Sequence, residues 1–169
     1  TLSGPGLPTP ASLEEMSIWN CPNLEAIPSL DNLTSLTELD ISSCDGLTSI
    51  PSGLASCTAL TRLHVNGCHN LISLSDHNLS SLQSLSYLCI SKCGKLQYLP
   101  KGLHSLSRLE KLSLGPFYEE LDSFPDFQVP SNELRLYGWP KLKSLPQQIQ
   151  HSASLTMLEI WKFDGLEAL

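Results

Sequence analysis

The sequence is poor in charged residues, and it lacks both long apolar segments and the short motifs of common enzymes. Charged residues make up 16% of the 169-residue chain. No apolar run approaches the length of about 20 residues that a membrane-spanning helix requires, so no membrane segment is expected. No Gly-x-x-x-x-Gly-Lys-Ser/Thr loop, Gly-x-Ser-x-Gly turn or His-Glu-x-x-His pair occurs. These absences argue against P-loop nucleotide binding, serine hydrolysis and zinc proteolysis by this chain.

Basic residues are also scarce. The chain has 10 Lys and Arg against 17 Asp and Glu, which gives a formal net charge of -7. Residues 1–61 contain seven acids and no Lys or Arg, so all of the net charge lies in this part. Binding to nucleic acid needs a basic surface, and we therefore expect no nucleic-acid partner. The acidic part instead favours a basic protein surface, although solvation alone is the simpler explanation of the same residues.

One pattern, Leu-x-x-Leu-x-Ile-x-x-Cys-x-x-Leu-x-x-Leu-Pro, recurs with variations along the whole chain and is clearest at 36–51 and 85–100. Its period is about 24 residues, within the range of leucine-rich repeats. The alternation Leu-x-Ile predicts a short strand, and the later apolar residues at intervals of three predict a turn back. The expected strand centres are Ile18, Ile41, Val65, Ile90, Leu114, Leu136 and Ile160.

These units predict a leucine-rich-repeat solenoid of the α/β horseshoe class, with residues 1–169 forming a single domain of about seven repeats. A parallel ladder of strands is expected on the concave face. Irregular or 3-10 turns, with little regular α-helix, are expected on the convex face, where prolines follow each turn. We also expect that the domain is truncated at both ends, and that uncapped coils favour end-to-end self-association as an artefact. The prolines are Pro28, Pro51, Pro100, Pro125 and Pro146.

The fifth and sixth units depart from the pattern. Ser131 stands where the sixth unit should have its first Leu, and one extra residue separates Phe117 from Leu121. Residues 115–130 are therefore expected to form an irregular repeat or loop. Loops often carry binding residues, so this loop is a candidate partner contact, although simple decay of the repeat explains the same departures. The candidate loop residues are Phe117, Tyr118, Glu119 and Glu120.

Four of the six cysteines, Cys21, Cys44, Cys68 and Cys93, occupy one position of the repeat. Phe117, Trp139 and Phe163 continue this position in later units, so we expect it to point an apolar group into the core. Copies on adjacent coils would have parallel Cβ vectors, which is poor disulfide geometry and favours reduced thiols in a reducing compartment. An even number of cysteines leaves a disulfide framework as the alternative.

A metal site is the other chemistry that the cysteines raise. His64, Cys68, His69, Cys89 and Cys93 include metal-ligating types. His64 and Cys89 are expected at the same exposed position of successive strands, but Cys68 and Cys93 are expected to point inward. The histidines fall at different positions of the repeat and do not converge with a nucleophile. A coil filled with leucine also offers no obvious substrate pocket. We therefore expect no metal, no cofactor and no enzymatic activity.

The register also predicts which side chains lie on the concave face. Trp19, Tyr87, Tyr137 and Trp161 fall there, where packing does not require large aromatic groups. Trp and Tyr are common anchors of protein interfaces, although Trp19 and Trp161 alternatively cover the ends of the stack. The predicted protein-contacting residues are Glu15, Trp19, Glu38, Asp40, Arg62, His64, Tyr87, Lys111, Arg135, Tyr137 and Trp161.

The units at 36–51 and 85–100, together with residues 12–22, resemble the repeats of plant intracellular nucleotide-binding leucine-rich-repeat immune receptors, the disease-resistance proteins. Repeats of secreted plant receptors more typically carry Asn at the Cys position, followed by a Gly-x-Ile-Pro stretch that is absent here. The resemblance implies a recognition module in the cytoplasm, or the nucleus, of a plant cell. Such a module senses a pathogen effector or a guarded host protein and restrains the adjoining nucleotide-binding domain of its own chain.

Two other functions stay open. Asn32-Leu33-Thr34 and Asn78-Leu79-Ser80 are glycosylation sequons, which is consistent with the ligand-binding ectodomain of a surface receptor. Such triplets arise readily in repeats rich in Asn, Leu and Ser, so they weigh less than the cysteine positions. A constitutive scaffold or adaptor is the second alternative, and it would need only one partner.

Overall fold

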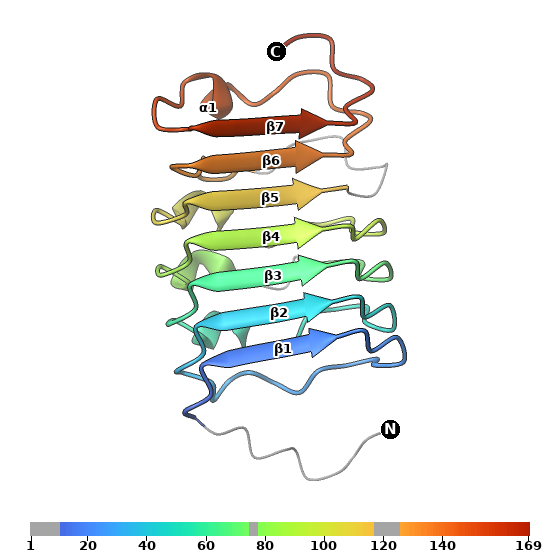
Figure 1. The fold of residues 1–169 in the computed structure, drawn as a ribbon, viewed down its shortest axis with the longest axis vertical. Coiled ribbons are helices and arrows are strands. Elements are labelled where there is room, and N and C mark those ends of the chain that lie inside the picture. Colours follow the sequence, from blue (N-terminus) through green and yellow to red (C-terminus); the bar gives the residue numbers. More distant parts are fainter. Residues whose placement is uncertain (1–10, 75–77, 117–125) are drawn as a thin grey trace.

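The computed structural model describes residues 11–74, 78–116 and 126–169. In these residues seven strands form one parallel sheet whose spatial order follows the chain, as Figure 1 shows. Each expected strand centre is the fourth residue of its strand, so the predicted ladder and its register are confirmed. The strands are β1 (Glu15–Trp19), β2 (Glu38–Ser42), β3 (Arg62–Asn66), β4 (Tyr87–Ser91), β5 (Lys111–Gly115), β6 (Glu133–Tyr137) and β7 (Met157–Trp161).

Every position of the repeat lies beside its own copy in the next coil. Ile41 of β2 is thus paired with Ile18 of β1 on one side and with Val65 of β3 on the other. Hydroxyls just before the strands support this register: Thr61 Oγ1 donates to the carbonyl of Thr37 at 3.1 Å, and Ser86 Oγ donates to that of Thr61 at 3.2 Å. These bonds satisfy carbonyl groups where one coil meets the next.

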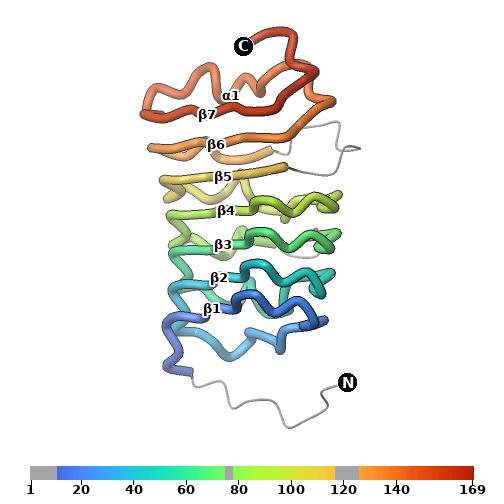
Figure 2. Tube along the Cα trace, turned by 45° about the vertical axis from the view of Figure 1, so that its right-hand side comes forward, coloured from blue at the N-terminus to red at the C-terminus, as the bar shows by residue number. Residues whose placement is uncertain are grey.

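The side of the stack opposite the sheet contains short turns, and Figure 2 shows how the coils follow one another along the stack. Among the described residues, three of these turns are 3-10 turns and one is a four-residue α-helix, so the prediction of 3-10 or irregular turns with little helix is confirmed. In the part of the chain that the structure describes, no helix has the length and apolar character needed to cross a membrane. The turns are η1 (Leu54–Ser56), η2 (Leu79–Ser81), η3 (Leu103–Ser105) and α1 (Gln147–Gln150).

The core runs through the stack between the sheet and the turns. Leu39, Leu63 and Leu88 are copies of one position and are at most 2% exposed. Burying such a side chain fully contributes about 1.5 to 3 kcal/mol. The equivalent residue of the last strand, Leu158, is 45% exposed, because the described residues place no further coil against β7. Stability is therefore concentrated in the middle coils.

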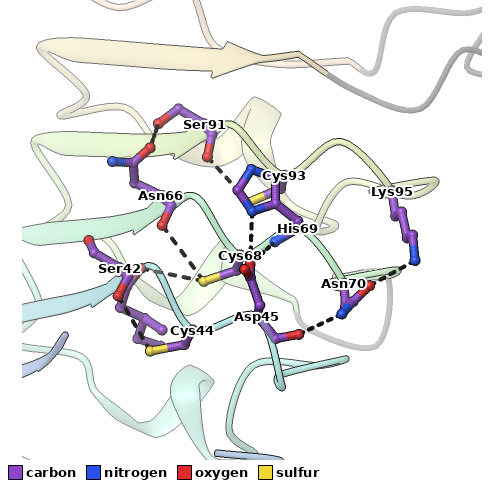
Figure 3. Close-up of polar contacts among 11 residues, drawn as sticks. Ser42, Cys44, Asp45, Asn66, Cys68, His69, Asn70, Ser91, Cys93 and Lys95 are labelled. Carbon is purple, nitrogen blue, oxygen red and sulfur yellow. Dashed lines mark hydrogen bonds and ion pairs between the residues drawn. The ribbon is translucent and has the colours of Figure 1, made fainter. Parts of the chain in front are cut away.

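The cysteine position points inward, as predicted. Cys44, Cys68 and Cys93 are at most 1% exposed, whereas Cys21 in the first coil is half-buried. Their thiols donate weak hydrogen bonds to carbonyls of their own turns, at 3.4 Å from Cys44 to Ser42 and 3.3 Å from Cys93 to Ser91. Figure 3 shows these successive turns with the polar side chains beside them. All six cysteines are free, and burial raises the pKa of Cys93 to about 12.

The residue after every strand except β5 turns the chain away from the sheet through a left-handed conformation. Gly67 and Gly138 adopt it with φ of 65° and 70°, and Lys92 and Lys162 adopt it with φ of 53° and 57°. Glycine accepts this conformation freely, whereas other residues pay about 1 to 2 kcal/mol for it. The fold therefore does not require lysine at this position.

The sixth unit forms a regular strand despite its degenerate sequence. Leu134 and Leu136 are at most 1% exposed, and the backbone N–H of Ser131 donates to the carbonyl of Leu109 at 3.0 Å. The segment 126–130 before it is irregular, as expected, and inserts Phe127 into the core. The predicted contact loop of Phe117, Tyr118, Glu119 and Glu120 lies outside the described residues.

Candidate functional site

The outward side chains of β1 to β7 form one surface, which we call the sheet face. All eleven predicted contact residues lie at outward positions of these strands, and the strand pairing places them in three parallel rows. Inward residues of the middle strands are buried, whereas outward residues are mostly half-buried or exposed. The sheet face has three distinct parts: an acidic end, a packed centre and a hollowed end.

The acidic end lies on β1 and β2. Glu15 is paired in register with Glu38, and Asp40 lies on the same strand as Glu38. Within the described chain Glu15 and Glu38 form no ion pair, and Asp40 accepts a hydrogen bond from Ser42 Oγ at 2.5 Å. Trp19, the last residue of β1, is 71% exposed and is paired in register with Ser42. This end therefore combines negative charge with an uncovered aromatic ring.

The centre of the sheet face is packed by three long side chains from β3 and β4. The guanidinium carbon of Arg62 lies 3.9 Å from the centroid of the Tyr87 ring, a cation–π contact. The rings of His64 and Tyr87 are stacked with 6.1 Å between centroids, and the Tyr87 hydroxyl is 3.4 Å from His64 Nδ1. These contacts hold the side chains in one arrangement before any partner binds.

The sequence predicts the register of Cys89 correctly but its exposure wrongly. Cys89 lies beside His64 in register, as predicted, but it is only 5% exposed because His64, Tyr87 and Ser91 surround the thiol. Burial acts to raise the pKa of Cys89, but hydrogen bonds with His64 and Ser91 outweigh it and lower the pKa below its ordinary value. The hydrogen bond with Cys89 in turn raises the pKa of His64.

The hollowed end lies on β5, β6 and β7 and begins with a chain of ion pairs. Lys111 Nζ is 2.9 Å from Glu133 Oε1, and Arg135 lies between Glu133 at 3.6 Å and Glu159 at 3.4 Å. The hydrogen bond from Lys111 lowers the pKa of the Glu133 carboxyl. The Arg135 charge is thus shared between two carboxylates in neighbouring strands.

A cleft of about 240 Å³ opens beside these ion pairs. It exists because two outward residues of β5, Ser113 and Gly115, are small, whereas the outward residues of β6 and β7 that line the cleft are large. Gly115 has φ of 116°, and a Cβ there would lie 1.8 Å from the carbonyl oxygen of Tyr137, so a side chain is excluded. The cleft is lined by Lys92, Ser113, Arg135, Leu136, Tyr137, Glu159 and Trp161.

Three residues that line the cleft were predicted from the sequence as contact residues: Arg135, Tyr137 and Trp161. Lys92 was not predicted. Lys92 follows β4 rather than lying in it, and its φ of 53° allows it to line the cleft. Lys162 stands at the same position after β7, and its Nζ lies 5.3 Å from the Trp161 ring centroid. The recurrence of lysine at this position of the repeat was the signal by which Lys92 could have been found. Two exposed large side chains of the turns, Ile72 and Tyr98, were also not singled out from the sequence, and they are 43% and 57% exposed.

A second hollow, of about 360 Å³, lies on the opposite side between residues 127–129 and the end of α1. It is larger, but its lining of Phe, Val, Ala, Ser and Gln contains no charged group to select a ligand. We therefore regard the cleft on the sheet face as the stronger candidate.

The described residues bring together no metal-binding cluster. In the ranges 11–74, 78–116 and 126–169 no three His, Cys, Asp or Glu side chains are placed to hold a metal ion. The pair of His64 and Cys89 does not line the cleft. What the sheet face offers chemically is a set of charged and aromatic groups at fixed spacing.

The described chain is a repeat solenoid of parallel strands, and its fold alone does not identify a function. No protein-family model matches the chain, and the comparison with curated proteins gives no match.

Proposed function

We propose that this chain is a protein-recognition module that binds its partner through the sheet face. The observation that carries the proposal is the exposure of aromatic rings where the core does not need them: Trp19 is 71% exposed and Trp161 is 60% exposed. Trp and Tyr are enriched in protein interfaces because they bury a large area with few rotatable bonds.

The arrangement of the sheet face supports the same proposal. The outward residues of β2, β3 and β5 sit on strands whose inward neighbours are buried in the core, so their backbone is fixed. In the centre, the stacking of Arg62 and His64 on Tyr87 orders three side chains in the free protein. A surface that is ordered in advance loses less conformational entropy when its partner binds.

The resemblance of the repeats supports a narrower proposal. On this basis the chain is the recognition part of a plant intracellular nucleotide-binding leucine-rich-repeat immune receptor. It senses a pathogen effector or a guarded host protein and restrains the nucleotide-binding domain of its own chain. Free, buried thiols at Cys44, Cys68 and Cys93 are compatible with the reducing cytoplasm that this proposal requires.

The complete transcript tests the receptor class directly. An upstream phosphate-binding loop within a nucleotide-binding domain is the expected result. A signal peptide upstream with a membrane span downstream would instead identify a surface receptor. This is the alternative that the exposed sequon residues Asn32 and Asn78 favour. A thiol count in protein from the native host, with glycan analysis of both asparagines, provides an independent test.

Site-specific photo-crosslinking tests the sheet face. A benzoylphenylalanine probe is placed at Trp19, Tyr87 or Trp161, and matched probes are placed at the exposed residues His104 and Gln148 of η3 and α1. In native-host cells we expect a crosslinked species shared by the sheet-face probes and absent from the other two. A partner captured only from His104 and Gln148 would assign recognition to the turns and reject the proposal.

A further inference from the structure

We propose that the cleft on β5 to β7 is an anchor site for an acidic segment of a protein partner. It accepts one aromatic side chain of that segment, and a neighbouring carboxylate of the segment pairs with Lys92. The inference rests on the proposed function and specifies the chemistry of the partner at one end of the sheet face.

The shape of the cleft fits a single side chain. Its volume of about 240 Å³ is below the range of about 300 to 1,000 Å³ that is typical of small-molecule sites. Two of its lining residues, Tyr137 and Trp161, are partners in register on neighbouring strands, and Ser113 leaves the space beside them open. An inserted aromatic ring can therefore contact both rings at offset or edge-to-face geometry.

One side of the cleft is held rigidly. The Tyr137 side chain is half-buried, and it projects from β6, whose inward residues Leu134 and Leu136 are buried in the core. Gly115 keeps the backbone of β5 close to that of Tyr137. The cleft is thus formed by the fold itself and needs no rearrangement to accept a side chain.

The charge around the cleft selects a carboxylate. Lys92 is exposed and has no ion-pair partner among the described residues. The one carboxylate that lines the cleft, Glu159, already faces Arg135 at 3.4 Å. Lys162 adds a second cation against the outer ring, Trp161. The charge left uncompensated at this end is therefore positive and attracts acidic groups.

The opposite end of the sheet face excludes the same segment. Glu15, Glu38 and Asp40 carry negative charge there, and residues 11–61 contain no Lys or Arg to offset it. Trp19 offers an exposed ring at that end too, but on one of the two strands that carry these carboxylates. An acidic aromatic segment is repelled from β1 and β2 and attracted to β5 to β7, so the face distinguishes its two ends.

Three blocked tripeptides probe this chemistry: acetyl-Glu-Phe-Glu-amide, acetyl-Gln-Phe-Gln-amide and acetyl-Lys-Phe-Lys-amide. Binding to the isotope-labelled full chain is followed by NMR. We expect the acidic peptide to shift the signals of Tyr137 and Trp161, and to bind about threefold more tightly than the Gln peptide, as a partly exposed ion pair allows. The Lys peptide should bind most weakly. Equal affinities, absence of binding, or larger shifts at Trp19 than at Trp161 would overturn the proposal.

Two variants and one control separate binding from folding. Lys92→Gly places at this position the residue type found at Gly67 and Gly138, so the thermal midpoint should not fall. It should nevertheless remove the preference for the acidic peptide and leave binding of the Gln peptide unchanged. Trp161→Ala should weaken both peptides, whereas the control Trp19→Ala should affect neither. A preference for the acidic peptide that survives Lys92→Gly would reject Lys92 as its source.

The outcomes also separate this inference from the proposed function. If peptide binding fails while photo-crosslinks still come from Trp19 and Tyr87, the cleft is rejected and recognition by the sheet face stands. If the crosslinks come only from His104 and Gln148, recognition by the sheet face is rejected whatever the cleft binds.

Discussion

Asp45 and His69 occupy neighbouring turns, and the Nδ1 atom of His69 lies 2.8 Å from Oδ1 of Asp45. The backbone N–H of His69 donates to the same oxygen at 3.1 Å. Asn70 continues the contact by donating its Nδ2 to the Asp45 carbonyl at 2.7 Å, and Lys95 of the next turn donates to Asn70 Oδ1 at 2.7 Å. Figure 3 shows this polar link across three successive turns. These hydrogen bonds connect successive coils through exposed and half-buried residues that follow the buried cysteines Cys44, Cys68 and Cys93.

This link predicts a pH dependence of stability. The hydrogen bond with the His69 side chain, followed by that with its backbone, lowers the pKa of Asp45 below its ordinary value of 3.8. A carboxyl whose pKa is lower in the folded state stabilises the fold above its unfolded pKa, and this contribution is lost as the pH falls through the folded pKa. In urea unfolding, Asp45→Asn should therefore reduce the loss of stability between pH 6 and pH 3.

The control for this measurement is Glu25→Gln. Glu25 is exposed and makes no hydrogen bond or ion pair among the described residues, so its substitution removes a carboxyl without removing such a link. An identical change in the pH dependence for both variants would show that the link between Asp45 and His69 does not contribute.

The loss of unfolding free energy caused by a core substitution should depend strongly on the coil in which the residue lies. Leu88→Ala removes a side chain that is 0% exposed in the central strand, and it should lower the free energy of unfolding by about 2 to 5 kcal/mol. Leu158→Ala removes the equivalent side chain of β7, which is 45% exposed, and should cost less than half as much. Chemical denaturation of the two variants under identical conditions measures the difference. Equal losses would mean that β7 is covered in solution.

Gly115 predicts a backbone effect that links the fold to the cleft. Gly115→Ala would place Cβ 1.8 Å from the Tyr137 carbonyl oxygen at φ of 116°, so we expect a loss of at least about 2 kcal/mol in unfolding free energy. Gly94→Ala is the matched control, because a Cβ at Gly94 meets no atom within 4 Å. A Gly115→Ala protein as stable as the Gly94→Ala protein would contradict the close approach of β5 and β6.

The inward cysteines predict protected thiols. Burial raises the pKa of Cys68, and it raises that of Cys93 to about 12, so neither forms a thiolate readily at neutral pH. Iodoacetamide should leave both unmodified in the native protein at pH 7.5 and modify both in urea, as read by peptide mass spectrometry. Rapid native labelling of Cys93 would show that its turn opens.

The register could be read from the sequence because the repeat fixes it. Ile41 and Val65 stand at the same position of successive units, so the copies had to align in the sheet. The inward direction of Cys68 followed from the same period, since Trp139 and Phe163 take its place in later units. Periodicity thus specified the strands, their order and which face each side chain occupies.

Local burial on the sheet face could not be read in this way. Alternation makes Cys89 an outward residue, but its exposure depends on how far His64 and Tyr87 extend over it. The cleft depends on the difference in size between the outward side chains of β5 and those of β6 and β7. Small Ser113 and Gly115, followed in later units by large Tyr137 and Trp161, were a signal of this difference in the sequence. The side chain of Lys92 was missed because its position depends on a left-handed backbone and not on strand alternation.

The in-register ladder also has a mechanical consequence. Each five-residue strand is joined to its neighbours by hydrogen bonds that run along the stacking direction from coil to coil. Tension applied between the two ends would load these connections in series, so the weakest junction would open first. The exposed Leu158 makes the last coil the natural starting point. Such a stack would lengthen by releasing one coil after another while its centre stays folded.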